Sequence, residues 1–276
     1  METTTTIATC PISGSPLKPV FSATVLRRHQ VTYYYCEESG LLKTEQPFWL
    51  EDAYRDAISG ADTGLVQRNI SNSNILEPIL GCLGLAQGRL LDFAGGYGLL
   101  TRLLRDKGFD CYTTDKYCAN LFAQTFEPGT DFKADALFAF EVMEHIEDPL
   151  KLLRDLFDCY SCRTLIFSTV TFGRMIPGKD WWYYGFESGQ HITFYQPRTL
   201  ALLADLLECT YYMLRPDLHL ITNLAVPRLN SFVLQNSYAR LLYATYLRGR
   251  RKGLSKTWDD HLKMKELLRT RWRSQT

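Results

Sequence analysis

The sequence has no long hydrophobic run and no basic leader. No segment reaches the roughly 18 uninterrupted apolar residues that a membrane-spanning helix needs. The first ten residues, METTTTIATC, contain neither lysine nor arginine and have no apolar core, so they do not resemble a secretory signal. We therefore expect a cytoplasmic protein that has no membrane partner.

The sequence also lacks an excess of charge of either sign. Lysine and arginine number 31 and aspartate and glutamate 30, which gives a formal net charge of +1 over 276 residues. This balance argues against nucleic acid as the main partner. A basic stretch is confined to the tail, residues 237–276, where we expect amphipathic helices with either a solvated basic face or a contact to an anionic partner.

Paired cysteine motifs are scarce among the eight cysteines. Cys159 and Cys162 form a single Cys-x-x-Cys pair with no partner pair, so we interpret them as packing residues. The other cysteines are scattered through apolar patterns, where a reduced thiol acts as a small hydrophobic group. The sequence therefore gives no reason to expect disulfides.

Two turns near the amino terminus resemble half of a zinc ribbon. Cys10 and Cys36 are each followed three residues later by a serine, Ser13 and Ser39, where a four-thiolate zinc site would have cysteine. His29 could supply a further ligand, but the spacing does not require it. We interpret residues 1–46 as a ribbon-like remnant without metal, and residual zinc remains the alternative.

The most informative stretch is residues 89–115. A short apolar strand containing Asp92 leads into the small-residue turn AGGYG at residues 94–98, and a helical pattern follows. A second strand, residues 109–114, ends at Asp115. This order is that of the nucleotide-binding half of a doubly wound fold, in which glycines allow the ligand to approach the backbone and the acid accepts from ribose hydroxyls.

The rest of the chain predicts an α/β protein in three parts. We expect a ribbon-like segment at residues 1–46, a nucleotide-binding domain at 47–236 and a basic helical tail at 237–276. Strands are predicted at residues 21–26 and 30–35 as a hairpin, and at 121–126, 134–140, 163–170, 211–214 and 231–235; helices are predicted over 47–58 and 65–80, from Pro149, and over 197–207.

Two later runs complete a recognisable pattern. Residues 140–145 read FEVMEH, and residues 189–195 read GQHITFY. Together with the glycine turn and Asp115, they make residues 47–235 resemble the class I S-adenosylmethionine-dependent methyltransferases, of the branch with an amino-terminal zinc-ribbon-like segment. The resemblance implies a Rossmann-like, doubly wound sheet of seven strands, the last one antiparallel, and S-adenosylmethionine as the cofactor.

The resemblance also implies the residues that bind this cofactor. They are Asp92, Ala94, Gly95, Gly96, Gly98, Asp115, Phe140, Glu141 and Val142. Arg68 is a further candidate, because it could reach the cofactor's carboxylate; the alternative is a solvated side chain. The family usually has glycine at position 94, and we expect Ala94 to fit there with a negative φ.

The candidates for catalysis are His145, Glu144 and His191. If the methyl acceptor is a hydroxyl, a histidine can remove its proton, with Glu144 orienting it or binding substrate. A structural role remains the alternative for both histidines. We expect no metal in this site. The acceptor is expected to be a hydroxyl of a sugar, polysaccharide precursor or related small metabolite. This expectation rests on the resemblance and on aromatic residues 181–184, which could stack on the acceptor; core or lid packing is the alternative for these residues.

Three other functions fit the sequence less well. A dinucleotide fingerprint would need its third glycine one position later than this turn has it. A non-catalytic scaffold would not need the Glu-His pair. A nucleic-acid methyltransferase is suggested only by the basic tail, and the sequence lacks the Asn/Asp-Pro-Pro-Tyr motif expected of enzymes that methylate base amino groups.

Overall fold

The computed structural model describes residues 9–54, 63–250 and 254–273, without the side chains of residues 248, 250 and 271–273. The chain divides into two compact units, each considered by itself below. We call Thr63–Phe138 with Ala225–Thr276 the glycine-turn unit, and Met1–Asp62 with Ala139–Leu224 the ribbon unit. Arg251, Lys252 and residues 55–58 of an expected helix lie outside the described residues. No described helix has the length and apolar character to cross a membrane.

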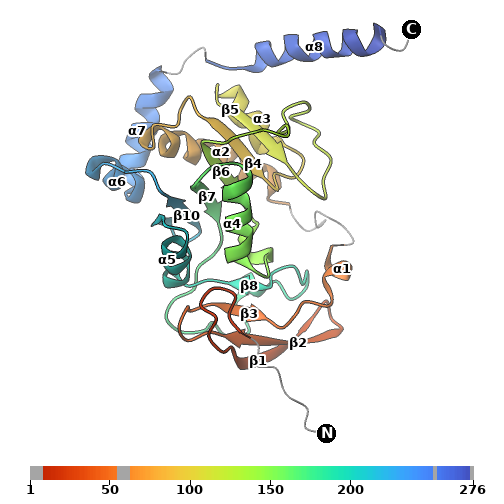
Figure 1. The fold of residues 1–276 in the computed structure, drawn as a ribbon, viewed down its shortest axis with the longest axis vertical. Helices are drawn as coiled ribbons and strands as arrows, with labels where there is room; N and C mark the ends of the chain where they lie inside the picture. Colours follow the sequence, from red (N-terminus) through yellow and green to blue (C-terminus); the bar gives the residue numbers. More distant parts are fainter. Residues whose placement is uncertain (1–8, 55–62, 251–253, 274–276) are drawn as a thin grey trace. The chain divides into compact units, whose positions relative to one another are not determined.

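In the glycine-turn unit, parallel strands carry the glycine turn at their carboxyl ends (Figure 1). Strand β4 (Arg89–Phe93) pairs with β5 (Asp110–Thr114) and with β6 (Ala136–Ala139). Helix α2 (Leu65–Cys82) precedes β4, and α3 (Leu99–Asp106) joins β4 to β5. Leu90 and Leu91 are fully buried, as expected for a parallel strand with both faces covered.

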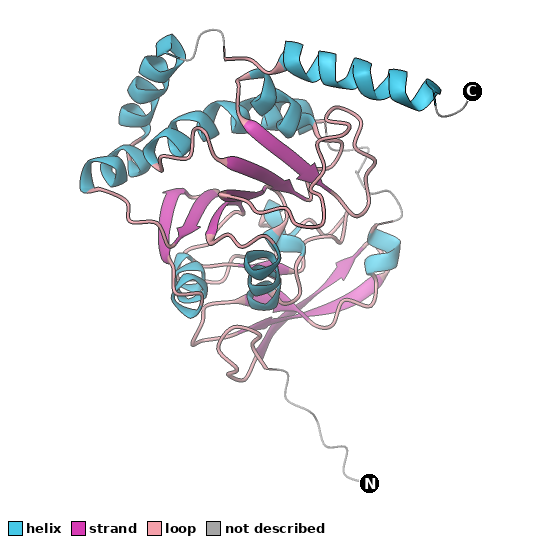
Figure 2. Cartoon of the chain, turned by 45° about the horizontal axis from the view of Figure 1, so that its top comes forward, coloured by secondary structure: helices cyan, strands magenta, loops and turns pink. Residues whose placement is uncertain are grey.

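Three helices complete this unit: α6 (Arg228–Gln235), α7 (Ser237–Arg250) and α8 (Thr257–Arg273), drawn in cyan in Figure 2. Helix α8 is tied to α3 by a buried ion pair, in which Arg105 donates to both carboxylate oxygens of Asp260 at 2.8 and 2.7 Å. The Arg105 guanidinium also lies over the Phe126 ring, 3.6 Å from its centroid. The expected helices of the tail are confirmed, and one of them is anchored by charge.

The ribbon unit begins with a four-stranded antiparallel sheet of strand order β1-β2-β3-β8. The predicted hairpin is confirmed as β1 (Lys18–Val25) and β2 (His29–Tyr35), followed by β3 (Leu42–Thr44) and a short helix α1 (Leu50–Ala53). Strand β8 (Thr193–Phe194) comes from the predicted aromatic loop and pairs with β3. Its Phe194 packs in one core with Tyr33 and Trp49.

The remainder of the ribbon unit has the expected order of helices and strands as far as β9 (Thr210–Arg215). The turn η1 (Met143–His145) leads into α4 (Pro149–Cys159), whose first turn is capped by Asp148, which accepts from the Lys151 N–H at 3.0 Å. Strand β7 (Thr164–Ser168), η2 (Trp182–Tyr184), α5 (Pro197–Leu206), β9 and β10 (Leu218–Thr222) follow. Strand β10 is antiparallel to both β7 and β9.

The strand order β5-β4-β6-β7-β10-β9 confirms the mixed α/β, Rossmann-like class with an antiparallel last strand. The described chain has five of the seven expected strands in this sheet, and β10 is a sixth strand that the sequence did not predict. The strand predicted at residues 121–126 is wrong: the Asn120 side chain bonds both the N–H and the carbonyl of Ala123, and Leu121 and Phe122 donate to the Tyr97 carbonyl. Local bonds have replaced the strand ladder.

The strand predicted at residues 231–235 is also wrong, because these residues lie in helix α6. The last strand is β10, whose sequence LHLIT was overlooked because a histidine interrupts its apolar run. His219 is nevertheless fully buried, since Tyr211 bonds its Nδ1 at 3.0 Å and its Nε2 lies 2.9 Å from the Thr169 carbonyl. A histidine with both nitrogens bonded can occupy a core strand.

Candidate functional site

The three glycines of the turn are required for three different reasons. A Cβ on Gly95 would lie 2.4 Å from both Asp92 Oδ2 and Thr113 Oγ1, so this position excludes any side chain. Gly96 has φ +57° and open space where a Cβ would be, which leaves its backbone accessible to a ligand. Gly98 has φ +80° and begins α3.

Ala94 does not have the backbone angle expected from the sequence. Its φ is +53°, in the left-handed region, whereas a negative φ was predicted. For a residue with a Cβ this conformation costs roughly 1–2 kcal/mol. The turn therefore requires a left-handed residue at position 94 even though the sequence supplies no glycine there.

Asp92 is a buried carboxylate without a complete set of partners. Among the described residues no hydrogen-bond donor reaches its Oδ2, which lies against Gly95. Burial, and then the charge of Asp115, raise the pKa of Asp92 to about 8, while the Thr101 hydroxyl acts in the opposite direction. A buried acceptor in this state would be stabilised by a donor, above all by a cation.

Asp115 holds the turn in place. Its Oδ2 accepts from the Gly96 N–H at 2.9 Å, and its Oδ1 accepts from the N–H groups of Tyr117 and Cys118 at 2.7 and 2.8 Å. The sequence predicted an acid here for ribose binding but not this second role. A carboxylate oxygen has more than one lone pair, so these bonds leave acceptor capacity for a ligand.

The other predicted cofactor residues are not part of this turn. Arg68 is exposed near the start of α2, and Phe140, Glu141 and Val142 follow β6 in the ribbon unit. Glu141 has a left-handed φ of +56°; its N–H donates to Ser168 Oγ, and the Ser168 hydroxyl donates to its carboxylate, both at 2.7 Å. The roles of these four residues in cofactor binding stay predictions.

In the ribbon unit, the three predicted catalytic residues lie together. One ligand atom from each of Glu144, His145 and His191 lies within 4.8 Å of the other two, and we call this group the Glu144 cluster. The two imidazole rings meet edge to face, with centroids 5.0 Å apart. Glu144 is fully buried, and neither of its carboxylate oxygens has a hydrogen-bond partner among the described residues. Burial raises the pKa of this carboxyl, and the neighbouring His191 partly opposes the shift.

The hydrogen bonds of the two histidines fix their tautomers. His145 Nδ1 lies 2.9 Å from the Gln190 carbonyl, and His191 Nδ1 lies 2.6 Å from the Tyr183 carbonyl. A carbonyl oxygen only accepts, so each ring donates from Nδ1, and a neutral ring then has a bare lone pair on Nε2. Burial, and then the charge on His191, lower the pKa of His145 to about 4, which keeps this ring neutral at pH 7.

Residues 189–195 hold the cluster in place mainly through backbone groups of residues 143–146. Ile192 donates its N–H to the Glu144 carbonyl at 2.8 Å. The Tyr195 hydroxyl donates to the Met143 carbonyl at 2.7 Å, and the Thr193 hydroxyl donates to the Ile146 carbonyl at 2.6 Å. The sequence singled out this run but gave no indication of these contacts, because they join residues about 50 positions apart.

The aromatic run at residues 181–184 is mostly core. Tyr183 and Tyr184 are buried in the hydrophobic core of this unit, and Trp181 packs against that core. Trp182 alone projects, with 74% of its surface exposed. Core packing is therefore correct for three of the four aromatics, and only Trp182 is available to stack on a ligand.

The two amino-terminal turns come together as a zinc ribbon would arrange them. Cys10 Sγ lies 3.2 Å from Ser39 Oγ, and Ser13 Oγ lies 3.4 Å from Cys36 Sγ. His29 is not part of this group, since it bonds Asp52.

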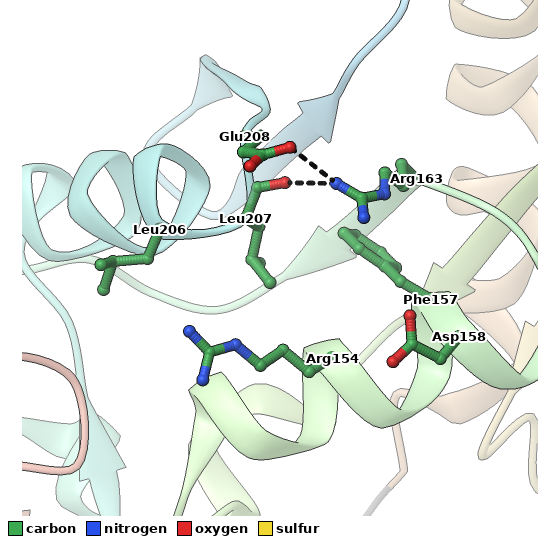
Figure 3. A pocket seen from close by; sticks show the side chains of 7 residues that line it. All are labelled: Arg154, Phe157, Asp158, Arg163, Leu206, Leu207 and Glu208. Atoms are coloured by element: carbon green, nitrogen blue, oxygen red, sulfur yellow. Dashed lines mark hydrogen bonds and ion pairs between the residues drawn. The ribbon is translucent and has the colours of Figure 1, made fainter.

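A separate hollow in the ribbon unit lies between α4 and the end of α5 (Figure 3). Arg163 crosses one side of it, donating to the Leu207 carbonyl at 3.2 Å and lying 3.5 Å from the Glu208 carboxylate. Arg154 lies on the opposite side. The hollow contains none of the predicted site residues, so we assign it no role in the chemistry.

Residues 67–211, more than half of the chain, match the family described as "Methyltransferase domain". The chain belongs to this methyltransferase family. The match confirms the resemblance to the class I S-adenosylmethionine-dependent methyltransferases. No curated protein sequence matches the chain.

Solved methyltransferase structures are similar to this chain at low identity. An O-methyltransferase family protein from Burkholderia thailandensis is 12% identical with a TM-score of 0.47, covering 70% of this chain and 66% of its own. CalO1, a methyltransferase in calicheamicin biosynthesis, is 14% identical with a TM-score of 0.42, covering 62% and 59%. Magnesium protoporphyrin IX methyltransferase from Synechocystis PCC 6803 is 13% identical with a TM-score of 0.41, covering 62% and 90%. Our chain thus spans well under two thirds of the CalO1 structure, and at these TM-scores the likenesses carry no conclusion about substrate.

Proposed function

We propose that this methyltransferase transfers a methyl group from S-adenosylmethionine to a hydroxyl of a small molecule. The observation that carries the proposal is the Glu144 cluster, in which bare imidazole nitrogens and an unpartnered carboxylate meet in a largely buried place. Methylating a hydroxyl requires that its proton be removed, and a group of positioned proton acceptors meets that need.

The glycine-turn unit fits the cofactor. S-Adenosylmethionine supplies an electrophilic methyl group on a sulfonium, together with an ammonium and ribose hydroxyls. Asp92 offers a buried acceptor for a cation, Asp115 retains acceptor capacity for hydroxyls, and Gly96 leaves its backbone open. The same residues do not suit a dinucleotide as the ligand. Its phosphates carry negative charge and would be repelled by Asp92 and Asp115.

On the acceptor side, His191 is the better candidate for the base. His145 is held neutral with a pKa of about 4, and so weak a base removes a hydroxyl proton inefficiently. His191 has a fixed ring, oriented by the Tyr183 carbonyl, and Glu144 lies beside it. We propose that His191 accepts the proton, that Glu144 stabilises the charge that results, and that His145 accepts a hydrogen bond from the substrate.

A sugar-like acceptor is the finer part of the proposal. Trp182 presents an exposed indole, and such rings stack on the apolar faces of sugars. The balanced net charge of +1 is in keeping with a neutral acceptor.

The test is a product assay. The protein is incubated with S-adenosylmethionine carrying a labelled methyl group and a panel of glycosides, polyols, phenols and amines, and S-adenosylhomocysteine and labelled products are quantified. We expect label on the oxygen of a hydroxyl compound. Label only on amines, or on nucleic acid in a parallel arm, would contradict the proposal.

A further inference from the structure

The Glu144 cluster contains acceptors that face one another without a donor between them. Both histidines donate from Nδ1 to backbone carbonyls, so their second nitrogens can only accept when the rings are neutral. The Glu144 carboxylate also only accepts when ionised; no described donor meets hydrogen-bond geometry at either oxygen, although the hydroxyls of Tyr183 and Thr169 are close enough to lower its pKa. Acceptor groups pointed at one another in a largely buried place are unstable unless a cation or a proton lies among them.

The hydrogen bonds that the two imidazoles donate from Nδ1 are of the kind that metal-binding histidines make. A ligating histidine normally donates its other N–H to a carbonyl or carboxylate, which fixes the ring and leaves the coordinating nitrogen bare. His145 and His191 both have this arrangement, with carbonyl oxygens at 2.9 and 2.6 Å. By contrast, both nitrogens of the buried His219 are used by protein groups, so it has no nitrogen to offer.

The spacing allows all three groups to reach one ion. Bonds from zinc to imidazole nitrogen and carboxylate oxygen are about 2.1 Å, which places two ligands of a tetrahedral site about 3.4 Å apart. One ring nitrogen of each histidine and one Glu144 carboxylate oxygen lie within 4.8 Å of one another, so the most distant pair must close by about 1.4 Å at most.

We propose that Glu144, His145 and His191 bind one divalent transition-metal ion of the Zn²⁺, Co²⁺ or Mn²⁺ class. Two imidazoles and one carboxylate suit these ions better than Mg²⁺ or Ca²⁺, which prefer oxygen ligands. The negative charge of Glu141, which acts on His145, adds to the attraction for a cation. Three protein ligands leave a position open, as in catalytic rather than structural metal sites.

The role of this ion in catalysis rests on the proposed function, although its binding does not. A hydroxyl coordinated at the open position loses its proton more easily, because the metal stabilises the oxyanion. The two histidines would then act as ligands, and the proton would leave to solvent rather than to His191. In this form the proposed O-methylation depends on the metal ion, and that dependence is measured separately from metal binding.

The first experiment measures binding without donor or acceptor. Full-length protein, stripped with EDTA, is titrated with Co²⁺ and Zn²⁺ by calorimetry and visible absorption. We expect one ion per chain and a Co²⁺ absorption band of a low-coordinate site with nitrogen and oxygen ligands. Glu144→Gln, which keeps the volume, and His191→Ala should each weaken binding by at least tenfold.

Two controls separate this site from other places where the ions could bind. His261→Ala removes an exposed histidine of α8 and should leave the affinity unchanged. The double variant Cys10→Ser/Cys36→Ser removes the thiols of the amino-terminal turns and should also leave it unchanged. Circular dichroism of each variant checks that it folds.

Several results would overturn the proposal. They are no binding to the wild-type protein, unchanged affinity in both Glu144→Gln and His191→Ala, and loss of binding in the cysteine double variant. If the cluster variants fail to fold, the wild-type Co²⁺ spectrum decides: a thiolate charge-transfer band, or no band, counts against the site. An O-methylation that EDTA leaves unchanged in a metal-free protein would remove the catalytic role but leave the proposed function intact.

Discussion

Asp92 in the glycine-turn unit and Glu144 in the ribbon unit are both buried carboxylates with hydrogen-bonding capacity that the described residues leave unused. They differ in what surrounds them. Asp92 lies beside a second acid, Asp115, and its pKa is raised by both burial and that charge. Glu144 lies beside imidazoles, and His191 partly offsets the effect of burial on its pKa.

The difference between the two surroundings indicates two kinds of ligand. Two acids beside an open glycine backbone suit a ligand that brings its own positive charge and hydroxyl groups, as S-adenosylmethionine does. A carboxylate among bare imidazole nitrogens suits a proton, passed on from a substrate, or a metal ion. The four predictions below separate these assignments, from the largest expected effect to the smallest.

Replacing His191 should have the largest effect on turnover. His191→Ala removes the proposed base, or a metal ligand, and a positioned proton acceptor is worth ~10²–10⁴-fold in rate. We expect turnover of the hydroxyl acceptor to fall by at least tenfold while circular dichroism stays unchanged. The control is His219→Gln, a buried histidine outside the cluster, and a loss of the same size there would show that the effect is one of folding.

Replacing Asp115 should weaken the cofactor rather than the chemistry. Asp115→Ala removes one backbone bond to the turn, two backbone bonds to residues 117 and 118, and an acceptor for the ribose; hydrogen bonds to a charged group contribute about 1.5–3 kcal/mol each. We expect the affinity for S-adenosylmethionine, measured by calorimetry, to fall by roughly 30-fold or more. Asp115→Asn keeps the shape of the side chain, and its affinity for S-adenosylmethionine should lie between those of the wild type and Asp115→Ala. Unchanged affinity in Asp115→Ala would refute the cofactor assignment.

Asp92 should make the stability of the ligand-free protein depend on pH. Because its folded-state pKa is about 8, well above that of an unfolded aspartate, its contribution is fully present below about pH 4 and is lost as the pH rises to 8. Thermal unfolding should therefore show a falling Tm between pH 5 and pH 8. In Asp92→Asn this fall should be smaller by several degrees, and equal slopes in the two proteins would contradict the buried, protonated state.

Ala94→Gly should have the smallest effect and the opposite sign. Glycine adopts the left-handed φ of +53° without strain, so the variant should gain about 1 kcal/mol in free energy of unfolding, measured by urea denaturation. Thr113→Gly, elsewhere in the same unit, serves as the contrast because it removes a buried side chain and should destabilise. A destabilised Ala94→Gly would mean that the turn does not need a left-handed residue there.

The sequence reveals the glycine turn because its geometry is local. Glycines and an acid within about 20 residues determine a strand, a turn and a helix, and all of these are present. The five matched strands and most of the helices follow from the same short-range patterns. The strand at residues 121–126 could not be excluded from its composition, since the bonds that Leu121 and Phe122 donate to the Tyr97 carbonyl join residues more than 20 positions apart.

The Glu144 cluster was only partly predictable. The three residues were identified by motif, but the sequence does not show that His191, 46 positions after His145, lies against it. Nor does it show that both rings donate to carbonyls. Those two hydrogen bonds are the basis of the proposed metal site, whereas the sequence led us to expect no metal. These features arise from contacts between distant segments, and no periodicity in the sequence reports them.

The central claim is that the two buried carboxylates belong to separate tasks, and one measurement tests it most directly. S-Adenosylmethionine is titrated by calorimetry, side by side, into wild-type protein, Asp115→Ala and His191→Ala. We predict that Asp115→Ala loses roughly 30-fold or more in affinity while His191→Ala binds within about twofold of wild type. Equal losses in both variants, or a loss confined to His191→Ala, would contradict the account.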